Sequence, residues 1–471
     1  MPHVFVSAAH KSSGKTTVSI GLCAALNDRG LTVQPFKKGP DYIDPMWLAS
    51  ASDRDCYNLD FYTMQDKEIR QTFDRYNYDA DISIIEGNKG LYDGLDLDGS
   101  NSNAALATML DAPVVLVLDA RGMTRGIAPL ILGYQAFDKN INIAGVILNQ
   151  LGGSRHEGKL RRVIEHYTDV KVIGAIHKHS DMAIVERHLG LVPSNESESA
   201  AKYIANISKH VKESVDLDQV INIASSAPVS KTVNFPVKKS NVSCRIAVAR
   251  DAAFGFYYAS DINAMRDAGA EIVEFDTIND TSLPDNIDGL FIGGGFPESS
   301  MQQLEDNVSM RNSIHDAIEA GLPTYAECGG MMYLSRSLTW NHQSNTMVGI
   351  IPGDTNMHEK PQGRGYVKIT ESEHFIWPQL ESNTPAQPEH QAHEFHYSSL
   401  DDFTPDNEFQ PAYTMKRGHG INGEFDGIMY KNMLACYAHQ RNVDSNPWVK
   451  RFIQFILIHK SSKNLAGIEL C

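Results

Sequence analysis

The sequence predicts an α/β protein with two domains, the first built on a doubly wound, mostly parallel sheet. The chain has 471 residues, which is too long for one hydrophobic core, so two or three domains are expected. Short apolar runs alternate with helical segments in the first half, a rhythm typical of βα units. A stretch rich in Ser, Pro, Val and Lys separates the halves. We therefore expect domains at 1–224 and 243–471 and a linker at 225–242.

The composition excludes several classes of protein. A content of 42% hydrophobic and 21% charged residues is ordinary for a folded chain. The formal net charge of −16 argues against nucleic acid or an anionic membrane as a partner. The six cysteines are dispersed without a CxxC pair, which favours a reducing compartment, the cytoplasm, over a disulfide or zinc framework. We expect neither a signal peptide nor a membrane helix.

The first expected strand, at 3–7, runs into a loop with the pattern of a phosphate-binding loop, G-x-x-x-x-G-K-[ST]. Ala9 stands at the first Gly position, and Gly14, Lys15 and Thr16 fill the others. Backbone N–H groups at the helix start bind phosphate oxygens in such loops, the Lys neutralises charge and the hydroxyl binds Mg²⁺. The alternative is a Ser/Gly-rich turn that only caps a helix. The candidate ATP-binding residues are Gly14, Lys15, Thr16 and Thr17.

Carboxylates follow two further expected strands of the first half. Asp41 and Asp44, flanked by Pro, are expected in a loop after the strand that begins at Val33, although a solvated Asp-Pro turn would read the same. Glu86 ends an apolar strand, as a Walker-B carboxylate beside a metal does. Asp93 follows in a loop at the carboxyl ends of the strands, where open α/β sheets bind ligands. We expect Mg²⁺ at Thr16, Asp44 and Glu86.

The rest of the first sheet and the start of the second domain come from shorter signals. Apolar strands are expected at 113–119, 143–149 and 170–176, and a helix at 200–212. In the second half we expect strands at 245–249, 289–292 and 324–327 and a helix at about 309–320.

Cys328 lies between the expected strand at 324–327 and a Gly-Gly pair, where a tight turn can present its thiol as in a nucleophile elbow. A small buried hydrophobe at a strand end is the alternative. Backbone N–H groups at Gly294, Gly295 and Gly329 are candidate oxyanion donors. His439 follows an apolar run and is the candidate base, although a structural His would also fit there.

The segment His393-Glu394-Phe395-His396 does not have the H-E-x-x-H spacing of a helical zinc site. In a strand His393 shares one face with Phe395, while Glu394 and His396 share the other. We therefore expect no metal there, and mixed or antiparallel strands beyond Cys328.

In order, these motifs resemble those of the cobyrinic acid a,c-diamide synthase family of glutamine-dependent amidotransferases over nearly the whole chain. The segments that carry the resemblance are 12–17, 38–44, 85–94, 186–191, 250–258, 293–298, 326–330 and 393–397. The resemblance implies a dethiobiotin-synthetase-like ATP domain joined to a class I glutaminase domain. It also implies that ATP phosphorylates a substrate carboxylate, and that ammonia from glutamine attacks the acyl phosphate.

The resemblance also implies roles for residues. Cys328 would be the nucleophile and His439 its base, while Lys15, Thr16 and Glu86 would serve ATP and Mg²⁺. Asp41, Asp44 and Asp93 would serve the metal, the acceptor or the intermediate. The acceptor would be an anionic tetrapyrrole, cobyrinate amidated at its a and c carboxylates in cobalamin biosynthesis. The cations expected to line its site are Lys37, Lys38, Arg187 and Arg250.

Two departures from the pattern leave alternatives. Arg441 stands two residues after His439, where ordinary class I glutaminases carry the Glu that completes a triad, so a Cys–His dyad is expected. The segments 437–440, 88–90 and 99–103 are similar to a sirohaem amidase branch linked to dissimilatory sulfite reductase. A partitioning or switch ATPase is a rival of another class, although His10 stands where such loops carry a second Lys. A binding protein with a decayed glutaminase is a third. A homodimer is compatible with the sequence.

Overall fold

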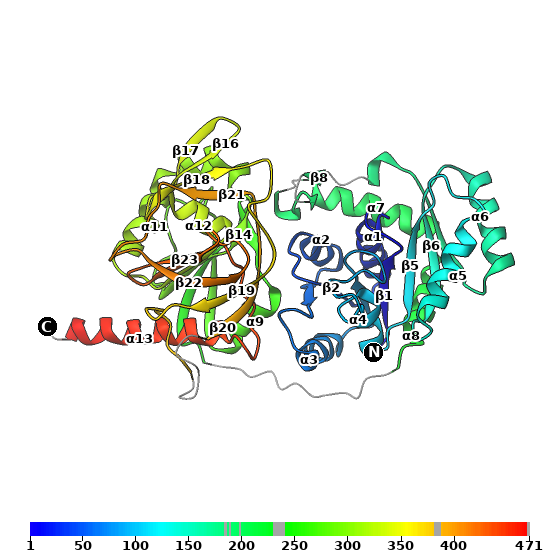
Figure 1. Cartoon of the computed structure of the whole chain (residues 1–471), viewed down its shortest axis with the longest axis horizontal. Helices are drawn as coiled ribbons and strands as arrows, with labels where there is room; N and C mark the ends of the chain where they lie inside the picture. Colours follow the sequence, from blue (N-terminus) through cyan, green and yellow to red (C-terminus); the bar gives the residue numbers. More distant parts are fainter. Residues whose placement is uncertain (183–185, 188–189, 197–198, 229–240, 381–387, 469–471) are drawn as a thin grey trace. The chain divides into compact units, whose positions relative to one another are not determined.

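The structure is a computed structural model that describes residues 1–182, 186–187, 190–196, 199–228, 241–380 and 388–468. It divides into two compact units, Met1–Pro236 and Val237–Cys471, which are described separately (Figure 1). Most of the expected linker at 225–242 lies outside the described residues, so the exact domain boundaries stay a prediction.

The first unit contains the doubly wound sheet that the sequence predicts. Within the described residues its seven strands have the order β3-β2-β4-β1-β5-β6-β7, and every pair is parallel. The strands are β1 His3–Ala8, β2 Val33–Lys38, β3 Tyr57–Leu59, β4 Ile82–Glu86, β5 Val114–Asp119, β6 Ile143–Leu151 and β7 Val172–His177. The chain reverses direction across the sheet beside β1, so the loops after β1, β2 and β4 meet at one edge.

Helices connect these strands. They are α1 Lys15–Asn27, α2 Ile43–Ser52, α3 Asp66–Asn77, α4 Asn103–Met109, α5 Ile127–Phe137, α6 Ser154–Tyr167, α7 Ala200–Ser214 and α8 Leu217–Ser225. Helix α1 packs against α2 and α7, and α5 against α6. The short elements η1 Ser180–Met182, β8 Glu186–Arg187, β9 Gly190–Leu191 and η2 Ser194–Glu196 precede α7.

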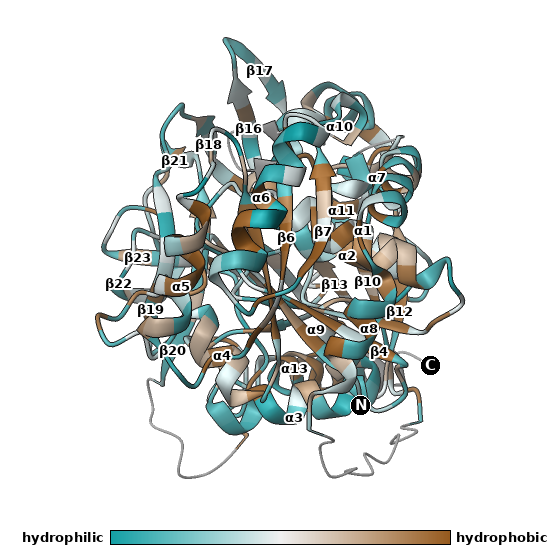
Figure 2. Cartoon of the chain, turned by 90° about the vertical axis from the view of Figure 1, so that its right-hand side faces the viewer, coloured by the Kyte–Doolittle hydropathy of each residue, from teal (hydrophilic) through white to brown (hydrophobic). Residues whose placement is uncertain are grey.

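Burial explains why the strands could be read from the sequence. Strands β1 and β4 are buried along their whole length, and strands covered on both faces are mostly apolar runs. Figure 2 shows β6 as hydrophobic, whereas α6 alternates hydrophobic and hydrophilic segments. A helix with one apolar stripe is what covers such a sheet.

The second unit is built on a mixed sheet of nine strands within the described residues, in the order β12-β10-β13-β15-β24-β23-β22-β19-β20. The pairs from β12 to β24 are parallel, and those from β24 to β20 are antiparallel. This confirms the loss of the βα rhythm beyond Cys328. The strands are β10 Cys244–Ala249, β12 Ala270–Phe275, β13 Gly289–Ile292, β15 Thr324–Glu327, β19 Gly363–Glu371, β20 Glu389–His396, β22 Gln410–Arg417, β23 Phe425–Tyr430 and β24 Met433–Cys436.

Smaller sheets and helices complete this unit. The pair β11 Phe254–Phe256 and β14 Gly294–Gly295 lies beside the sheet, and a further sheet holds β16 Ser335–Trp340, β17 Gln343–Thr346, β18 Ile351–Met357 and β21 Ser398–Asp401. The helices are α9 Ala259–Asp267, η3 Pro297–Ser299, α10 Met301–Asp306, α11 Val308–Glu319, α12 Gly329–Leu334 and α13 Trp448–Ile468. Two apolar clusters form the core. Of the described helices, none combines the length and apolarity needed to cross a membrane.

One local prediction is wrong. Asp44 was expected in a loop, but it lies in the first turn of α2. The Pro that follows it suggested a turn, yet Pro is tolerated in the first turn of a helix, where backbone N–H groups have no partner in the helix.

Candidate active sites

The candidate phosphate loop in the first unit is contacted by the side-chain amide of Asn149, which no local motif predicts. Gly14 has a φ of +82°, and a Cβ there would lie 2.1 Å from Nδ2 of Asn149. That buried Nδ2 donates to the backbone oxygen of Ser13 at 2.9 Å. The Ser13 hydroxyl in turn donates to the oxygen of His10 at 2.8 Å. The loop is therefore fixed by β6 as well as by its own turns.

Glu86 is the centre of a buried polar cluster beside this loop. It ends β4 and is fully buried. Its Oε1 accepts from the Thr16 hydroxyl at 2.8 Å and lies 2.9 Å from Lys37 Nζ, and it also pairs with Lys15. Its Oε2 has no hydrogen-bond partner among the described residues. A buried carboxylate oxygen without a partner is costly, so this atom is a candidate ligand for a cation.

Two aspartates complete the cluster. Asp44 pairs with Lys37 and accepts from the Thr16 hydroxyl at 3.2 Å, and Asp41 Oδ2 lies 3.5 Å from Lys37 Nζ. Burial opposes the charge of Lys37, but Asp44, Glu86 and Asp41 raise its pKa well above the usual value. Burial lowers the pKa of Lys15. With both lysines protonated, two ammonium groups face three carboxylates, and the excess negative charge suits a cation.

The structure places Asp41 and Asp93 differently. Asp41 Oδ1 accepts the backbone N–H groups of Ile43 and Asp44 at 3.0 and 3.2 Å, at the start of α2. Asp93 is exposed, outside the cluster, and accepts the N–H of Gly90 at 2.9 Å. Its loop still adjoins the phosphate loop, because a Cβ at Gly90 would lie 2.6 Å from the backbone oxygen of Ala9.

The cations expected at the tetrapyrrole site are spread over both units. Lys38 in β2 is nearly buried, and burial lowers its pKa to about 8. Arg250 in the second unit pairs with Glu274 at 2.8 Å. The side chain of Arg187 lies outside the described residues. Within the first unit, Lys37 forms ion pairs with the carboxylate cluster. Lys38 is the next residue in the chain.

Cys328 forms the expected elbow in the second unit. Strand β15 ends at Glu327, and Cys328 turns the chain into α12 with a φ of +48° and a ψ of −104°. Its N–H donates to the oxygen of Cys436 on the neighbouring strand at 2.7 Å, and its side chain is 6% exposed. A positive φ at a non-glycine residue is strained, and such strain gathers at functional sites.

The three glycines proposed as oxyanion donors are packed against this elbow. A Cβ at Gly329 would lie 2.9 Å from both N and O of Gly295, and one at Gly294 would lie 2.6 Å from Cε1 of His439. Neither position has room for a larger residue. The backbone of β14 thus lies close to both the elbow and the imidazole, which is the placement that an oxyanion site requires.

His439 is buried beside Cys328. Its backbone N–H donates to the oxygen of His393 at 2.7 Å, which ties the segment after β24 to β20. Burial opposes its charge, but contact with the Cys328 side chain and with Glu327 raises the pKa of His439 to about 10. The predicted pair of nucleophile and base is therefore brought together in one buried site, with His439 in contact with the Cys328 side chain.

Glu327 lies beside the Cys328–His439 pair, a neighbour that the sequence did not reveal. Its Oε2 lies 3.5 Å from Nδ1 of His439, and its Oε1 accepts the backbone N–H of Gln440 at 2.9 Å. Arg441, at the usual position of the third triad member, instead places its guanidinium 4.4 Å from the ring centre of Tyr258. The only signal in the sequence was that Glu327 directly precedes the nucleophile.

The segment at 393–396 is a strand, as predicted, and its polar groups support the structure. Glu394 accepts the backbone N–H groups of His419 and Gly420, both at 2.8 Å. The His396 ring stacks on Tyr437 with 3.8 Å between centroids. Burial and the nearby His439 lower the pKa of His393 to about 3, so this ring is neutral.

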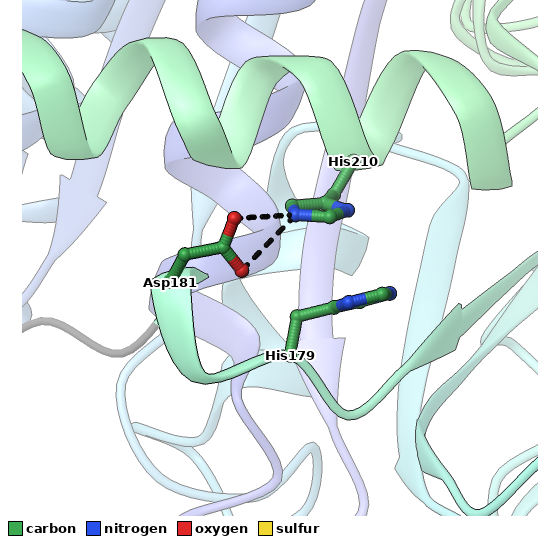
Figure 3. A group of neighbouring side chains, drawn as sticks. All are labelled: His179, Asp181 and His210. Carbon is green, nitrogen blue, oxygen red and sulfur yellow. Dashed lines mark hydrogen bonds and ion pairs between the residues drawn. The ribbon is translucent and has the colours of Figure 1, made fainter.

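A second group of side chains with metal-ligand chemistry lies in the first unit, near the end of β7. His179, Asp181 and His210 place their ligand atoms within 4.8 Å of one another. Figure 3 shows His210 facing the carboxylate, with its Nε2 at 3.0 and 3.2 Å from the two oxygens of Asp181. The His179 ring stacks on His210 with 4.0 Å between centroids. Because His179 and Asp181 are exposed, a hydrogen-bonded pair near the surface accounts for this group.

Comparisons with known proteins cover both units. Residues 3–186 match the model of an AAA domain, and residues 245–446 match that of a CobB/CobQ-like glutamine amidotransferase domain. Relatives named cobyrinate a,c-diamide synthase align over most of the chain. That of Magnetococcus marinus is 42% identical and covers 97% of each chain. That of Dehalococcoides mccartyi (strain ATCC BAA-2266) is 37% identical and covers 96% of this chain and 98% of its own. That of Methanosarcina acetivorans is 40% identical, with coverage of 94% and 93%.

Proposed function

Because the chain belongs to the cobyrinate a,c-diamide synthase family, we propose that it is a ligase that transfers glutamine nitrogen to the a and c carboxylates of cobyrinate. ATP would supply the energy. The observation that carries the proposal is that one chain holds both a Cys–His elbow and a phosphate loop beside a carboxylate cluster. Each half supplies what the other lacks, one the nitrogen and the other an activated carboxylate.

Cys328 and His439 are proposed to release ammonia from glutamine. The thiol proton passes to His439, and the sulfur attacks the carboxamide carbon. Backbone N–H groups at Gly294, Gly295 and Gly329 are proposed to bind the oxyanion. His439 then returns the proton to the nitrogen as the C–N bond breaks, which leaves a thioester. Water cleaves the thioester, glutamate leaves and the thiol is restored.

The first unit is proposed to activate the acceptor. A carboxylate is a poor electrophile until its oxygen becomes part of a phosphate leaving group. The acceptor carboxylate therefore attacks the γ-phosphorus of ATP, ADP leaves, and ammonia displaces phosphate from the acyl phosphate to form the amide. Gly14, Lys15, Thr16 and Thr17 would bind the phosphates, and phosphate oxygens would replace Glu86 as the partner of Lys15.

The carboxylate cluster fits a divalent cation. The unpartnered buried Oε2 of Glu86, the Asp44 carboxylate and the Thr16 hydroxyl are oxygen donors of the type that Mg²⁺ prefers. We propose that these three residues hold Mg²⁺, which when bound would offset the charge of the β- and γ-phosphates. Asp41 at the start of α2 and Asp93 on the adjacent loop are proposed to face the acceptor or the acyl phosphate.

A partitioning or switch ATPase is the less supported alternative, because the relatives are named cobyrinate a,c-diamide synthase and residues 245–446 match a glutamine amidotransferase domain. The sirohaem branch differs only in the acceptor. A decayed glutaminase would lack glutamine hydrolysis although the elbow is intact.

The test supplies ATP, Mg²⁺, glutamine and cobyrinate, with mass spectrometry of the products and a parallel assay of glutamate release. The expected result is two successive amidations that depend on ATP. Amidation of sirohydrochlorin or sirohaem in place of cobyrinate would overturn the acceptor. No glutamate release, with amidation from ammonium salts alone, would establish the decayed glutaminase instead.

A further inference from the structure

We propose that Glu327 is the positioning residue of the Cys328–His439 pair, in the role that a third triad member has in other Cys and Ser enzymes. The inference rests on the proposed glutaminase function of this site. It assigns a role to a residue upstream of the nucleophile, whereas the usual third member follows the histidine and is absent here.

The topology of the sheet creates this juxtaposition. Strands β15 and β24 are parallel neighbours, with Glu327 opposite Cys436. His439 lies three residues beyond Cys436, so it crosses the end of β15, where Glu327 and Cys328 stand in succession. Glu327 Oε2 lies 3.5 Å from Nδ1, which leaves Nε2 to receive the proton of Cys328. The distance is longer than a hydrogen bond, as catalytic contacts often are before a substrate is bound.

The carboxylate itself is held in one orientation. Its Oε1 accepts from the N–H of Gln440 at 2.9 Å and from the hydroxyl of Tyr325. Tyr325 is fully buried and also accepts from the Gln440 side-chain amide at 3.0 Å. With Oε1 committed to these donors, only Oε2 faces the imidazole. Packing and hydrogen bonds that lock a carboxylate in this way are what positioning requires.

Other charged and titratable groups near His439 do not compete for this role. Arg441 turns away to Asp261, 4.0 Å between Nε and Oδ1. The His393 ring, on β20, is 6.5 Å from the His439 ring between centroids and neutral, because burial and His439 lower its pKa to about 3. Cys328 itself also contacts His439. Glu327 is thus the carboxylate that can stabilise an imidazolium at this site.

The decisive variant is Glu327→Gln, because the neighbours fix how the new amide must lie. The N–H of Gln440 is a donor and requires an acceptor, so the amide oxygen takes the place of Oε1. The NH₂ group then faces Nδ1 of His439 and donates to it, which moves the imidazole proton to Nε2. In that tautomer His439 cannot accept the proton of Cys328. A comparable exchange in a catalytic triad lowers kcat by roughly 10⁴-fold.

The test measures kcat and KM for glutamine hydrolysis, amidation with ammonium salts, and the pH dependence of Cys328 alkylation by iodoacetamide. For Glu327→Gln we expect kcat with glutamine to fall by roughly 10³-fold with a small change in KM, and ammonia-dependent amidation to stay at the parent level. Alkylation near neutral pH should slow and recover only as the pH passes an ordinary thiol pKa of about 8.5.

Three further variants separate positioning from structural support. Tyr325→Phe removes a partner of Oε1 but keeps the carboxylate, so a loss of less than about tenfold is expected. Glu319→Gln changes a partly buried glutamate that pairs with Lys431, and should match the parent. Glu327→Asp withdraws the carboxylate from Nδ1 and should lose glutamine use but keep ammonia use. If Glu327→Gln does not fold, the Glu327→Asp variant tests the positioning role instead.

Parent-like glutamine kcat and parent-like pH dependence in Glu327→Gln would overturn the proposal. So would an equal loss with glutamine and with ammonia, or a Tyr325→Phe variant as impaired as Glu327→Gln, because both indicate structural support only. A parent enzyme that hydrolyses no glutamine would instead overturn the proposed function, which keeps the two failures distinct.

Discussion

Cys328 has a backbone conformation that few residues other than glycine adopt, with a φ of +48° and a ψ of −104°. Such a conformation costs about 1–3 kcal/mol, and the bond from its N–H to Cys436 at 2.7 Å helps to hold it. The strain lifts the thiol off the end of β15 toward His439. A buried cysteine with only a packing role would not need this turn, so the geometry favours the nucleophile over the small hydrophobe.

The first prediction concerns the thiol. Cys328→Ser should abolish amidation with glutamine, because a hydroxyl is a far weaker nucleophile than a thiolate. Amidation with ammonium salts should continue at the parent rate, because the change leaves the first unit intact. Product mass under each nitrogen source checks this. Loss of activity with both sources would mean that Cys328 supports the structure instead.

The second prediction follows from the charge of His439. Its pKa is raised to about 10, so the imidazolium persists below that pH and favours a thiolate at Cys328. Alkylation of Cys328 should therefore be fast and nearly constant from about pH 6 to 9, whereas an unassisted thiol reacts tenfold faster per pH unit below its pKa of about 8.5. His439→Asn should restore that steep dependence.

The other described cysteines act as internal controls for the labelling. Burial raises the pKa of each of them, so they should stay unlabelled; they are Cys23, Cys56, Cys244 and Cys436. A Cys471→Ser background removes the remaining thiol, and peptide mass spectrometry locates the adduct. A tenfold rise per pH unit at Cys328 in the parent would contradict the thiolate–imidazolium pair.

At the scale of elements, the turn between β1 and α1 shows how a glycine can be required by more than its backbone angle. Gly14 and Gly30, at the two ends of α1, both have a φ of +82°. A Cβ at Gly14 would collide with Asn149 at 2.1 Å, whereas one at Gly30 would meet nothing within 4 Å. A side chain at either position would adopt the same strained backbone conformation, but only one at Gly14 would also collide with a neighbour.

The third prediction uses this matched pair. Either Gly→Ala change should cost about 1–2 kcal/mol from the left-handed conformation, but only Gly14→Ala should also displace the phosphate loop. We expect its KM for ATP to rise at least about tenfold, with Gly30→Ala unchanged. Steady-state kinetics with ammonium salts measures this without the glutaminase. An equal effect of both changes would remove the assigned role of Asn149.

The sequence could predict a feature when the residues that define it lie close together in the chain. Strands β1, β4 and β5 were readable because buried parallel strands are continuous apolar runs. The elbow and the phosphate loop were readable because a turn and its chemistry lie within a few residues. Asn149 and Glu327 were not, since their contacts depend on which strands become neighbours across more than a hundred residues. Asp44 was misplaced because Asp-Pro reads equally well as a turn and as a helix start.

At the scale of the whole molecule, the proposed reaction requires two independent chemistries, each within one compact unit. The described contacts of Lys15 are with Glu86 and Thr16 of the first unit, and those of His439 are within the second. A substitution confined to one cluster should therefore silence one chemistry and spare the other. The loss of one activity in one variant could also reflect misfolding. Two variants that each lose a different activity and keep the other show that the two chemistries are separate.

The fourth prediction concerns two such variants. Lys15→Met keeps the aliphatic stem and removes the charge that meets the phosphates, so it should abolish amidation with glutamine and with ammonium salts alike. Its basal glutamine hydrolysis, assayed as glutamate release without ATP, should equal that of the parent. Cys328→Ser should show the opposite, with no hydrolysis and intact ammonia-dependent amidation.

Lys11→Met is the matched control, because Lys11 lies in the same loop with an exposed side chain and should keep both activities. If Lys15→Met also lost basal hydrolysis while its melting temperature matched the parent, the second unit would depend on the nucleotide site even without a nucleotide. Glutamine hydrolysis and carboxylate activation would then be coupled. Retained hydrolysis would establish that the elbow generates ammonia by itself and that the phosphate loop makes the ammonia productive.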